Sequence, residues 1–249
     1  MKAFVINLDV NKERMAFVDA QLKRRGVAYE RISGVDGSAL SRAERKRCVN
    51  GFRWWCAIGR PVTAAEIGCA FSHYSIYKRM VDQNIPSALI FEDDVLVSDV
   101  INNSLKVAEK FLSVAIPQVL LFSNHDRIAR EKIGVVAFAE NGVAVVRSQS
   151  GICADGYCLN LAAAKALLGQ NVPMIVPCDH WWRWVANGTI ELFHVFPSAI
   201  AQNQRRFGSS TSVDRIETLM PLSARWLVYK AKRLLGKPLD WLMTVVFSK

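Results

Sequence analysis

Short apolar runs alternate along the chain with segments in which apolar residues recur at the spacing of a helix. The apolar runs predict strands at residues 2–8, 27–33, 88–91, 119–122, 157–161 and 190–195, and a hairpin at 135–138 and 143–147. Helical spacing and capping signals predict a first helix that ends at residue 25. They predict further helices at 64–82, 99–113, 162–169 and about 180–186. This alternation predicts an α/β fold with a mostly parallel central sheet flanked by helices.

Three acids, Glu92, Asp93 and Asp94, follow the apolar run at 88–91. Side chains alternate along a strand, so Glu92 and Asp94 should point to one side and Asp93 to the other. Adjacent acids repel one another and resist burial, and the carboxyl ends of strands in α/β sheets open into the ligand crevice. A divalent cation held by carboxylates and shared with substrate phosphates fits this position. The alternative is a strand that ends in a solvated acidic turn.

The helix at 64–82 carries a capping box, because Thr63 and Glu66 have the required spacing. Glu66 and His73 lie roughly on one face of this helix. Together with the acidic strand, the segment from Glu66 to His73 resembles glycosyltransferase family 25, the lipopolysaccharide and lipooligosaccharide galactosyltransferase group. The weaker matches to the family are residues 6–9 with Arg14, 35–37, 156–157, 177–179, Pro197 and Gln202. Their order and spacing agree over residues 1–210, and the resemblance implies the GT-A nucleotide-sugar transferase fold.

The resemblance implies transfer of a hexose, galactose from UDP-galactose, to a lipooligosaccharide or lipopolysaccharide acceptor, with inversion to a β-linkage. Mn²⁺ or Mg²⁺ suits oxygen ligands and would bind the donor diphosphate. Asp94 is our first candidate for a direct ligand, with Glu92 as a second ligand or a sugar contact. Asp93 is a catalytic candidate that approaches the donor ribose or sugar. Which of the three acids touches the ion stays open, because strands often kink at their ends.

The attacking hydroxyl of the acceptor needs a base near its proton, and Asp179 is our candidate. It follows Pro177 and precedes an aromatic helix that begins near Trp181. In the alternative interpretation Asp179 is the N-cap of that helix, where its pKa would be lowered. His180 is the second candidate for the base.

Donor contacts are expected after the first two strands, where the resemblance implies a uridine site. Asp36 suits the ribose hydroxyls, Arg14 the phosphate or base, and Asn7 lies in the same region. The alternative for Arg14 is a solvated helix residue. Gln202 and Arg205 follow Pro197 in an expected active-site loop and are candidates for acceptor binding.

Two residues of the helix at 64–82 complete the donor candidates. Glu66 is explained fully by its capping role, so donor binding and a purely structural role both stay open. His73 could contact the donor or orient an acid, and a buried core histidine is the alternative.

The chain has 249 residues and no linker-like or repeated segment, which predicts one domain at 1–210 and a tail at 211–249. The net charge is +10, and the tail has no acid between Arg225 and Leu239 but several aromatic and aliphatic residues. Such a basic amphipathic tail is typical of helices that lie on anionic membranes, and a helix packed on the domain is the alternative. Four cations at 42–47 form a second basic patch.

The first apolar run is too short for a signal peptide, and no run is long enough to span a membrane. The six cysteines contain no Cys-x-x-Cys pair and indicate reduced thiols. We therefore expect a cytoplasmic protein, peripheral at the inner face of the cytoplasmic membrane, with no nucleic-acid partner. The competing functions are a Mg²⁺-dependent nucleotidyl or phosphoryl transferase, for which no P-loop is present, and a non-enzymatic module that binds membranes or nucleic acid.

Overall fold

The computed structural model describes residues 1–112, 115–123 and 136–207, and the predicted tail at 211–249 lies outside the described residues. The chain divides into two compact units. Of the described residues, those within Met1–Val35, Phe71–Gln170 and 178–207 form the first unit, and Asp36–Ala70 and Asn171–Pro177 form the second. The predicted domain at 1–210 therefore contains parts of both units. Among the described residues, no helix has the length and apolar character that a membrane crossing requires.

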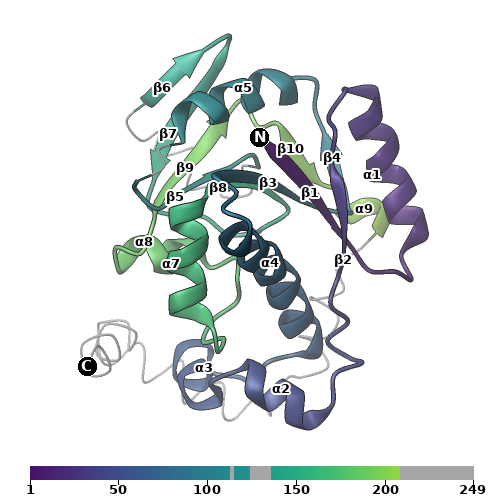
Figure 1. Ribbon diagram of the computed structural model, residues 1–249, viewed down its shortest axis with the longest axis vertical. Coiled ribbons are helices and arrows are strands. Elements are labelled where there is room, and N and C mark those ends of the chain that lie inside the picture. The colour runs from purple at the N-terminus through teal and green to yellow at the C-terminus, as the bar shows by residue number, and fades with distance from the viewer. Residues whose placement is uncertain (113–114, 124–135, 208–249) are drawn as a thin grey trace. The chain divides into compact units, whose positions relative to one another are not determined.

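An eight-stranded sheet with the order β2-β1-β3-β8-β5-β9-β7-β6 forms the centre of the first unit (Figure 1). Its strands are β1 (Lys2–Asn7), β2 (Glu30–Ser33), β3 (Ser87–Glu92), β5 (Gln118–Leu121), β6 (Val136–Glu140), β7 (Val143–Ser148), β8 (Gly156–Asn160) and β9 (Glu191–Phe196). The α/β class and every strand predicted from an apolar run are confirmed.

The sheet is mixed, so the prediction of a mostly parallel sheet is wrong. β1 is parallel to β2 and β3, and β5 is parallel to β9. β8, however, runs antiparallel to both of its neighbours, and β6-β7-β9 are joined by antiparallel pairs. The hairpin explains part of this, because the turn at Asn141 and Gly142, both at positive φ, can join only antiparallel strands.

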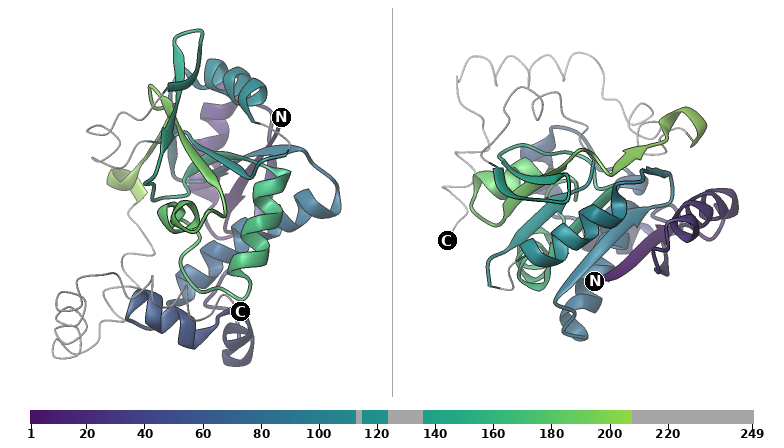
Figure 2. Two further views of the ribbon diagram at one scale, coloured as in Figure 1. Left: turned by 90° about the vertical axis from the view of Figure 1, so that its left-hand side faces the viewer. Right: turned by 90° about the horizontal axis from the view of Figure 1, so that it is seen from above.

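Helices and a small second sheet complete the first unit. The helices are α1 (Lys12–Arg24), α5 (Ile101–Phe111), α7 (Leu161–Asn171), α8 (Trp181–Ala186), α9 (Gln204–Phe207) and most of α4 (Ala64–Asp82). β4 (Val95–Val97) and β10 (Ile200–Gln202), which were not predicted, pair in antiparallel fashion. Figure 2 shows α9 beside α1, where the rings of Phe17 and Phe207 meet edge to face.

The core of the first unit is apolar, as the strand pattern requires. α1 buries Val18 and Leu22 in a cluster with Phe91 of β3 and Phe193 of β9. β3 and β5 are buried on both faces, which is typical of the centre of a sheet covered by helices. This packing fixes the end of β3, where the acids follow.

The second unit contains two helices, α2 (Arg42–Cys48) and α3 (Gly51–Ile58). Each begins with a side-chain cap, from Ser41 and from Asn50. Gly37 lies against the start of α4, where a Cβ atom would come within 1.8 Å of the Ala64 carbonyl oxygen. A larger residue at position 37 would therefore collide with the helix backbone.

Candidate active site

The three acids lie where β3 ends and the chain turns toward β4. β3 ends at Glu92, and the two aspartates form the turn. Asp93 and Asp94 are 7% and 5% exposed, so the alternative of a solvated acidic turn is wrong. Arg14 Nη1 lies 3.5 Å from Asp93 Oδ1 and 3.6 Å from Asp94 Oδ2. Both carboxylates thus face one guanidinium, and the predicted alternation of their side chains is wrong because the strand has already ended.

Asp93 is held by side chains from the first helix and the first strand. Asn7, 2% exposed at the end of β1, donates from Nδ2 to Asp93 Oδ2 over 2.6 Å. Arg31 Nε donates to Asn7 Oδ1 over 3.0 Å and fixes which way the amide points. Arg14 is anchored in turn, since its Nη2 donates to the Phe207 carbonyl oxygen over 2.8 Å. Asn7 and Arg14, both predicted from sequence, therefore meet the acids, whereas Arg31 was missed.

Asp94 is the least compensated acid of this group. Among the residues that the structure describes, none donates a hydrogen bond to its buried Oδ1 atom. Burial, followed by the charge of Glu92, raises the pKa of Asp94 to about 7. Burial also raises the pKa of Asp93, although the hydrogen bond from Asn7 opposes this. A buried carboxylate oxygen without a partner among other acids fits a divalent cation, which prefers oxygen ligands.

Glu92 is linked to a chain of buried polar groups. Its Oε1 lies 3.3 Å from His73 Nε2, and His73 Nδ1 lies 2.8 Å from the Tyr157 hydroxyl. The Tyr157 and Tyr77 hydroxyls are 2.5 Å apart. His73 is 1% exposed, while the Glu92 side chain keeps 26% of its surface accessible. His73 is thus a buried histidine that orients an acid, which joins two of the roles considered from the sequence.

Asp155 is a buried acid of this region that sequence reasoning missed. It is 1% exposed, and its Oδ1 accepts a hydrogen bond from Ser123 Oγ over 2.6 Å. Its backbone oxygen accepts from the Glu92 backbone nitrogen over 2.9 Å. Its charge is one of the smaller causes that raise the pKa of Asp94. Only the antiparallel register of β3 and β8, which the sequence does not reveal, brings Asp155 opposite Glu92.

Two predicted donor residues, Asp36 and Glu66, belong to the second unit. The Asp36 carboxylate is exposed and accepts from Ser38 N and Oγ over 2.8 and 2.6 Å. Glu66 is 4% exposed, and the guanidinium of Arg60 contacts both of its carboxylate oxygens. The backbone nitrogen of Thr63 also donates to Glu66, and the Thr63 hydroxyl accepts from Glu66 N. The predicted capping box is confirmed.

Asp179 lies half-buried in the turn before α8. The N-cap of α8 is His180, and no side chain makes the capping hydrogen bond. The alternative that Asp179 serves as the helix N-cap is therefore wrong. Its carboxylate is not held by the start of α8, which is compatible with a role as a base.

Gln202 lies near the acidic turn because β10 pairs with β4. Its register partner is Val95, the residue after Asp94. The next residue, Asn203, donates from its backbone nitrogen to the Asp94 carbonyl oxygen over 2.8 Å. The side chain of Arg205 lies outside the described residues.

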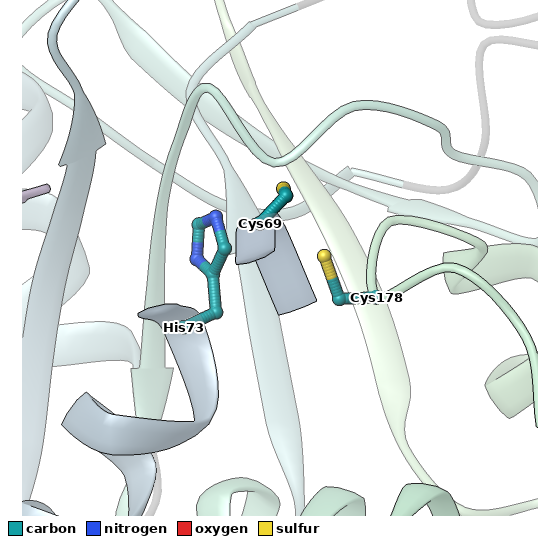
Figure 3. A group of neighbouring side chains, drawn as sticks. All are labelled: Cys69, His73 and Cys178. Carbon is teal, nitrogen blue, oxygen red and sulfur yellow. The ribbon is translucent and has the colours of Figure 1, made fainter. Parts of the chain in front are cut away.

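A group of thiol and imidazole side chains lies near this region (Figure 3). His73 and Cys178 place potential ligand atoms within 4.8 Å of each other, and Cys69 precedes His73 by one turn of α4. Both ring nitrogens of His73 already face polar atoms, one of Tyr157 and one of Glu92. We therefore do not assign a metal centre to this group.

Comparison with known proteins points to one family. The model of glycosyltransferase family 25, described as an LPS biosynthesis protein, matches residues 1–182. The human protein named procollagen galactosyltransferase 2 is 28% identical over 68% of this chain and 27% of its own length. The Rattus norvegicus protein named "Probable inactive glycosyltransferase 25 family member 3" is 26% identical over 72% of this chain and 32% of its own. The chain thus spans less than a third of the length of either relative.

A crystal structure of the galactosyltransferase LgtC in complex with donor and acceptor sugar analogues is similar at a TM-score of 0.40 and 13% identity. The match covers 89% of this chain and 85% of LgtC. A TM-score of this size does not establish a common fold, so the GT-A assignment stays a prediction.

Proposed function

Because the chain belongs to glycosyltransferase family 25, we propose that it transfers galactose from UDP-galactose to a lipooligosaccharide or lipopolysaccharide acceptor. The name of the human relative supports galactose as the sugar, and the description of the family supports a glycolipid acceptor. Inversion to a β-linkage is carried over from the family resemblance alone. The proposal includes Mn²⁺ or Mg²⁺ at the acidic turn.

The observation that carries the proposal is the Asp94 carboxylate. It is buried beside two other acids, and its Oδ1 accepts no hydrogen bond from the residues that the structure describes. A negative charge in this state is costly unless a cation compensates it, and Arg14 Nη1 lies 3.6 Å from Oδ2, beyond hydrogen-bond distance. We assign Asp94 and the more accessible Glu92 as cation ligands. A cation bound there would neutralise the charge that grows on the diphosphate as the sugar–phosphate bond breaks.

The surrounding residues hold this carboxylate cluster in one geometry. Asn7 orients Asp93 through a 2.6 Å hydrogen bond, and Arg14 keeps Asp93 and Asp94 close together. His73 orients Glu92 through its Nε2 atom, which lies 3.3 Å from Glu92 Oε1. A preorganised set of carboxylates needs little rearrangement when charge develops in the transition state, which favours catalysis. Asp93 remains our candidate for a catalytic contact to the donor.

The proposed base is Asp179, which would take the proton of the attacking acceptor hydroxyl. The proposal is supported by its half-buried position directly before His180, the N-cap of α8. A pH–rate profile separates it from His180. We expect Asp179→Asn to remove the acidic limb of the profile together with most of the rate, and His180→Ala to retain that limb. The reverse result would assign the base to His180.

The remaining contacts stay proposals. Arg14 and Asn7 are proposed for the donor site, although both also support the acids. Asp36 and Glu66 are proposed donor residues whose carboxylates already have local partners. Gln202 is proposed for the acceptor on the basis of its position beside the acidic turn, and Arg205 on the sequence alone.

Turnover is the first measurement, because one relative carries the word inactive in its name. UDP release should be measured for UDP-galactose, UDP-glucose and UDP-N-acetylglucosamine on truncated lipooligosaccharide acceptors, with and without Mn²⁺. We expect Mn²⁺-dependent transfer with a preference for UDP-galactose. Full activity after removal of divalent cations would refute the cation proposal. Mn²⁺-dependent binding of UDP without any transfer would indicate an inactive relative.

The cytoplasmic, membrane-peripheral location also stays a prediction, and the tail at 211–249 on which it partly depends lies outside the described residues. Deletion of residues 222–249 tests it directly. We expect the shortened protein to bind anionic vesicles more weakly than the full chain. Unchanged binding would remove the tail from the proposal.

A further inference from the structure

The second unit carries a concentration of positive charge that its packing does not require. α2 contains four cations and a single acid in seven residues, and none of its side chains is buried. A helix on the surface of a globular protein usually packs an apolar stripe against the core. The acid, Glu44, is occupied by the capping box, where its Oε2 accepts from Ser41 N over 2.8 Å. Of the four cations, Arg42, Lys46 and Arg47 are exposed and Arg45 is half-buried.

α3 adds two exposed aromatic side chains to this surface. Phe52 and Trp55 are 65% and 40% exposed, and their i, i+3 spacing places them on one face of the helix. The opposite face is anchored by Trp54, which is 1% exposed and donates from Nε1 to the Arg60 carbonyl oxygen over 2.8 Å. Two adjacent exposed aromatics beside a charged segment are typical of an interaction site.

The two helices are joined by a short link that backbone hydrogen bonds hold in place. Only Val49 and Asn50 separate them, and this joint is fixed by Met174, whose nitrogen donates to Cys48 O over 2.8 Å and whose oxygen accepts from Asn50 N over 3.0 Å. Asn50 also caps α3 by accepting from Arg53 N over 3.1 Å. Figure 1 shows α2 and α3 following one another through this short joint. The helix that carries the cations and the helix that carries the exposed aromatics are therefore joined by a fixed two-residue link.

We propose that this surface, the basic–aromatic face formed by Arg42, Lys46, Arg47, Phe52 and Trp55, docks onto anionic lipid bilayers. Charge complementarity favours anionic headgroups, because the cations of α2 are opposed by one acid that is already occupied. The aromatics select a bilayer over other polyanions, because Trp and Phe gain most at the boundary between headgroups and acyl chains. A phosphorylated glycan would use the cations and leave Phe52 and Trp55 in water. The proposal is independent of the transferase function and of the tail.

Co-sedimentation of the full chain with vesicles of equal parts phosphatidylcholine and phosphatidylglycerol tests the proposal. We expect Arg42→Gln, Lys46→Gln and Arg47→Gln together to lower the partition coefficient on the order of 100-fold, at about fivefold per cation. Each single substitution should cost about fivefold, which provides a second test if the triple variant folds poorly. The matched control removes three exposed cations of the first unit, Lys12, Arg24 and Lys106, and should change binding by no more than about twofold.

The aromatic half of the face has its own variant. Phe52→Ser with Trp55→Ser should lower binding about tenfold at both low and high salt, because the lost contribution is apolar rather than electrostatic. Three results would overturn the proposal: wild-type protein that does not bind these vesicles, equal losses in the α2 variant and its control, or an aromatic variant that binds like wild type. The last result would indicate a purely electrostatic surface for another polyanion. These results are distinct from a failure of the proposed transferase function, because co-sedimentation measures binding to vesicles and not the release of UDP.

Discussion

Two buried carboxylates show how different the start of α4 is from the end of β3. Glu66 and Asp94 are almost equally buried, at 4% and 5% exposure. Glu66 accepts hydrogen bonds on both oxygens from Arg60 and a further one from Thr63. Asp94 Oδ2 lies 3.6 Å from Arg14 Nη1, and Oδ1 accepts no hydrogen bond from any described residue. The two carboxylates are thus almost equally buried, but only Glu66 accepts hydrogen bonds on both of its oxygens.

The difference separates a structural acid from a functional one. A buried charge that is fully hydrogen-bonded and paired is stable in its site, so its interactions already explain why it is there. A buried charge with an open oxygen is kept at a cost to stability, and such costs concentrate at sites that bind or react. Two carboxylates with nearly the same burial therefore lead to different predictions, loss of stability at Glu66 and loss of function at Asp94.

The largest expected effect is on turnover. Asp94→Asn should lower kcat with UDP-galactose about 10²–10³-fold, as is usual for loss of one electrostatic contact to a transition state. The thermal midpoint of the metal-free variant should not fall, because a poorly compensated charge has been removed. Asp99→Asn, at an exposed acid paired with Arg25, is the control and should leave both properties unchanged. Unimpaired turnover in the Asp94 variant would show that Asp94 is not required for catalysis.

The second effect is on stability. Glu66→Gln breaks a buried ion pair and leaves the Arg60 guanidinium without its charged partner. We expect the free energy of unfolding to fall by about 3 kcal/mol in urea titrations. The matched control is Glu44→Gln, which removes the acid of the exposed capping box of α2 and should cost less. Equal losses in the two variants would mean that the capping bond, rather than the buried ion pair, carries the effect.

The third effect depends on pH. Burial raises the pKa of Asp94 to about 7, above the value of about 3.9 in an unfolded chain. The folded state therefore binds the proton of Asp94 more tightly than the unfolded chain does. The stability that this proton contributes is complete below pH ~4 and is lost as the pH rises to ~7. Without divalent cations, wild type should lose stability relative to Asp94→Asn by up to about 1.4 kcal/mol per pH unit in this window.

Mn²⁺ should change the pH dependence of stability only when the Asp94 carboxylate is present. A cation bound to the ionised carboxylate should restore the stability of wild type near pH 7 and leave Asp94→Asn unaffected. Thermal unfolding of both proteins across the pH range, with and without Mn²⁺, measures the difference. A wild type that gains no stability from Mn²⁺ at pH 7 would contradict the assigned ligand.

The smallest expected effect concerns Arg31, which holds Asn7 in position to hydrogen-bond Asp93. Arg31→Gln removes the two hydrogen bonds by which Arg31 holds Asn7, at 3.0 and 3.2 Å. Because Arg31 contacts Asp93 only through Asn7, we expect the KM for the UDP-sugar to rise about three- to tenfold while kcat changes little. Arg79→Gln, which removes an exposed ion pair with Glu30, is the control. A loss of kcat without a change in KM would place Arg31 in a different role.

Local features of the fold were predictable from the sequence. The helix predicted at 64–82 has the bounds Ala64–Asp82, because a capping box at its start and helical spacing are both properties of near neighbours. The hairpin around Asn141 and Gly142 was predictable for the same reason. The antiparallel pairing of β8 with β3 and the pairing of β4 with β10 were not, since their register partners are 65 to 107 positions apart and no local pattern encodes the partner.

The sequence by itself determined that three acids close a buried strand, that a capped helix precedes it, and which family the chain belongs to. Only the tertiary structure decided that Asp93 and Asp94 face the same guanidinium and that one oxygen of Asp94 lacks a hydrogen bond from the described residues. The physical reason is the range of the interactions involved. Propensity and capping act over a few residues, whereas the burial and charge around Asp94 come from segments such as α1, 79 residues from Asp93 along the chain.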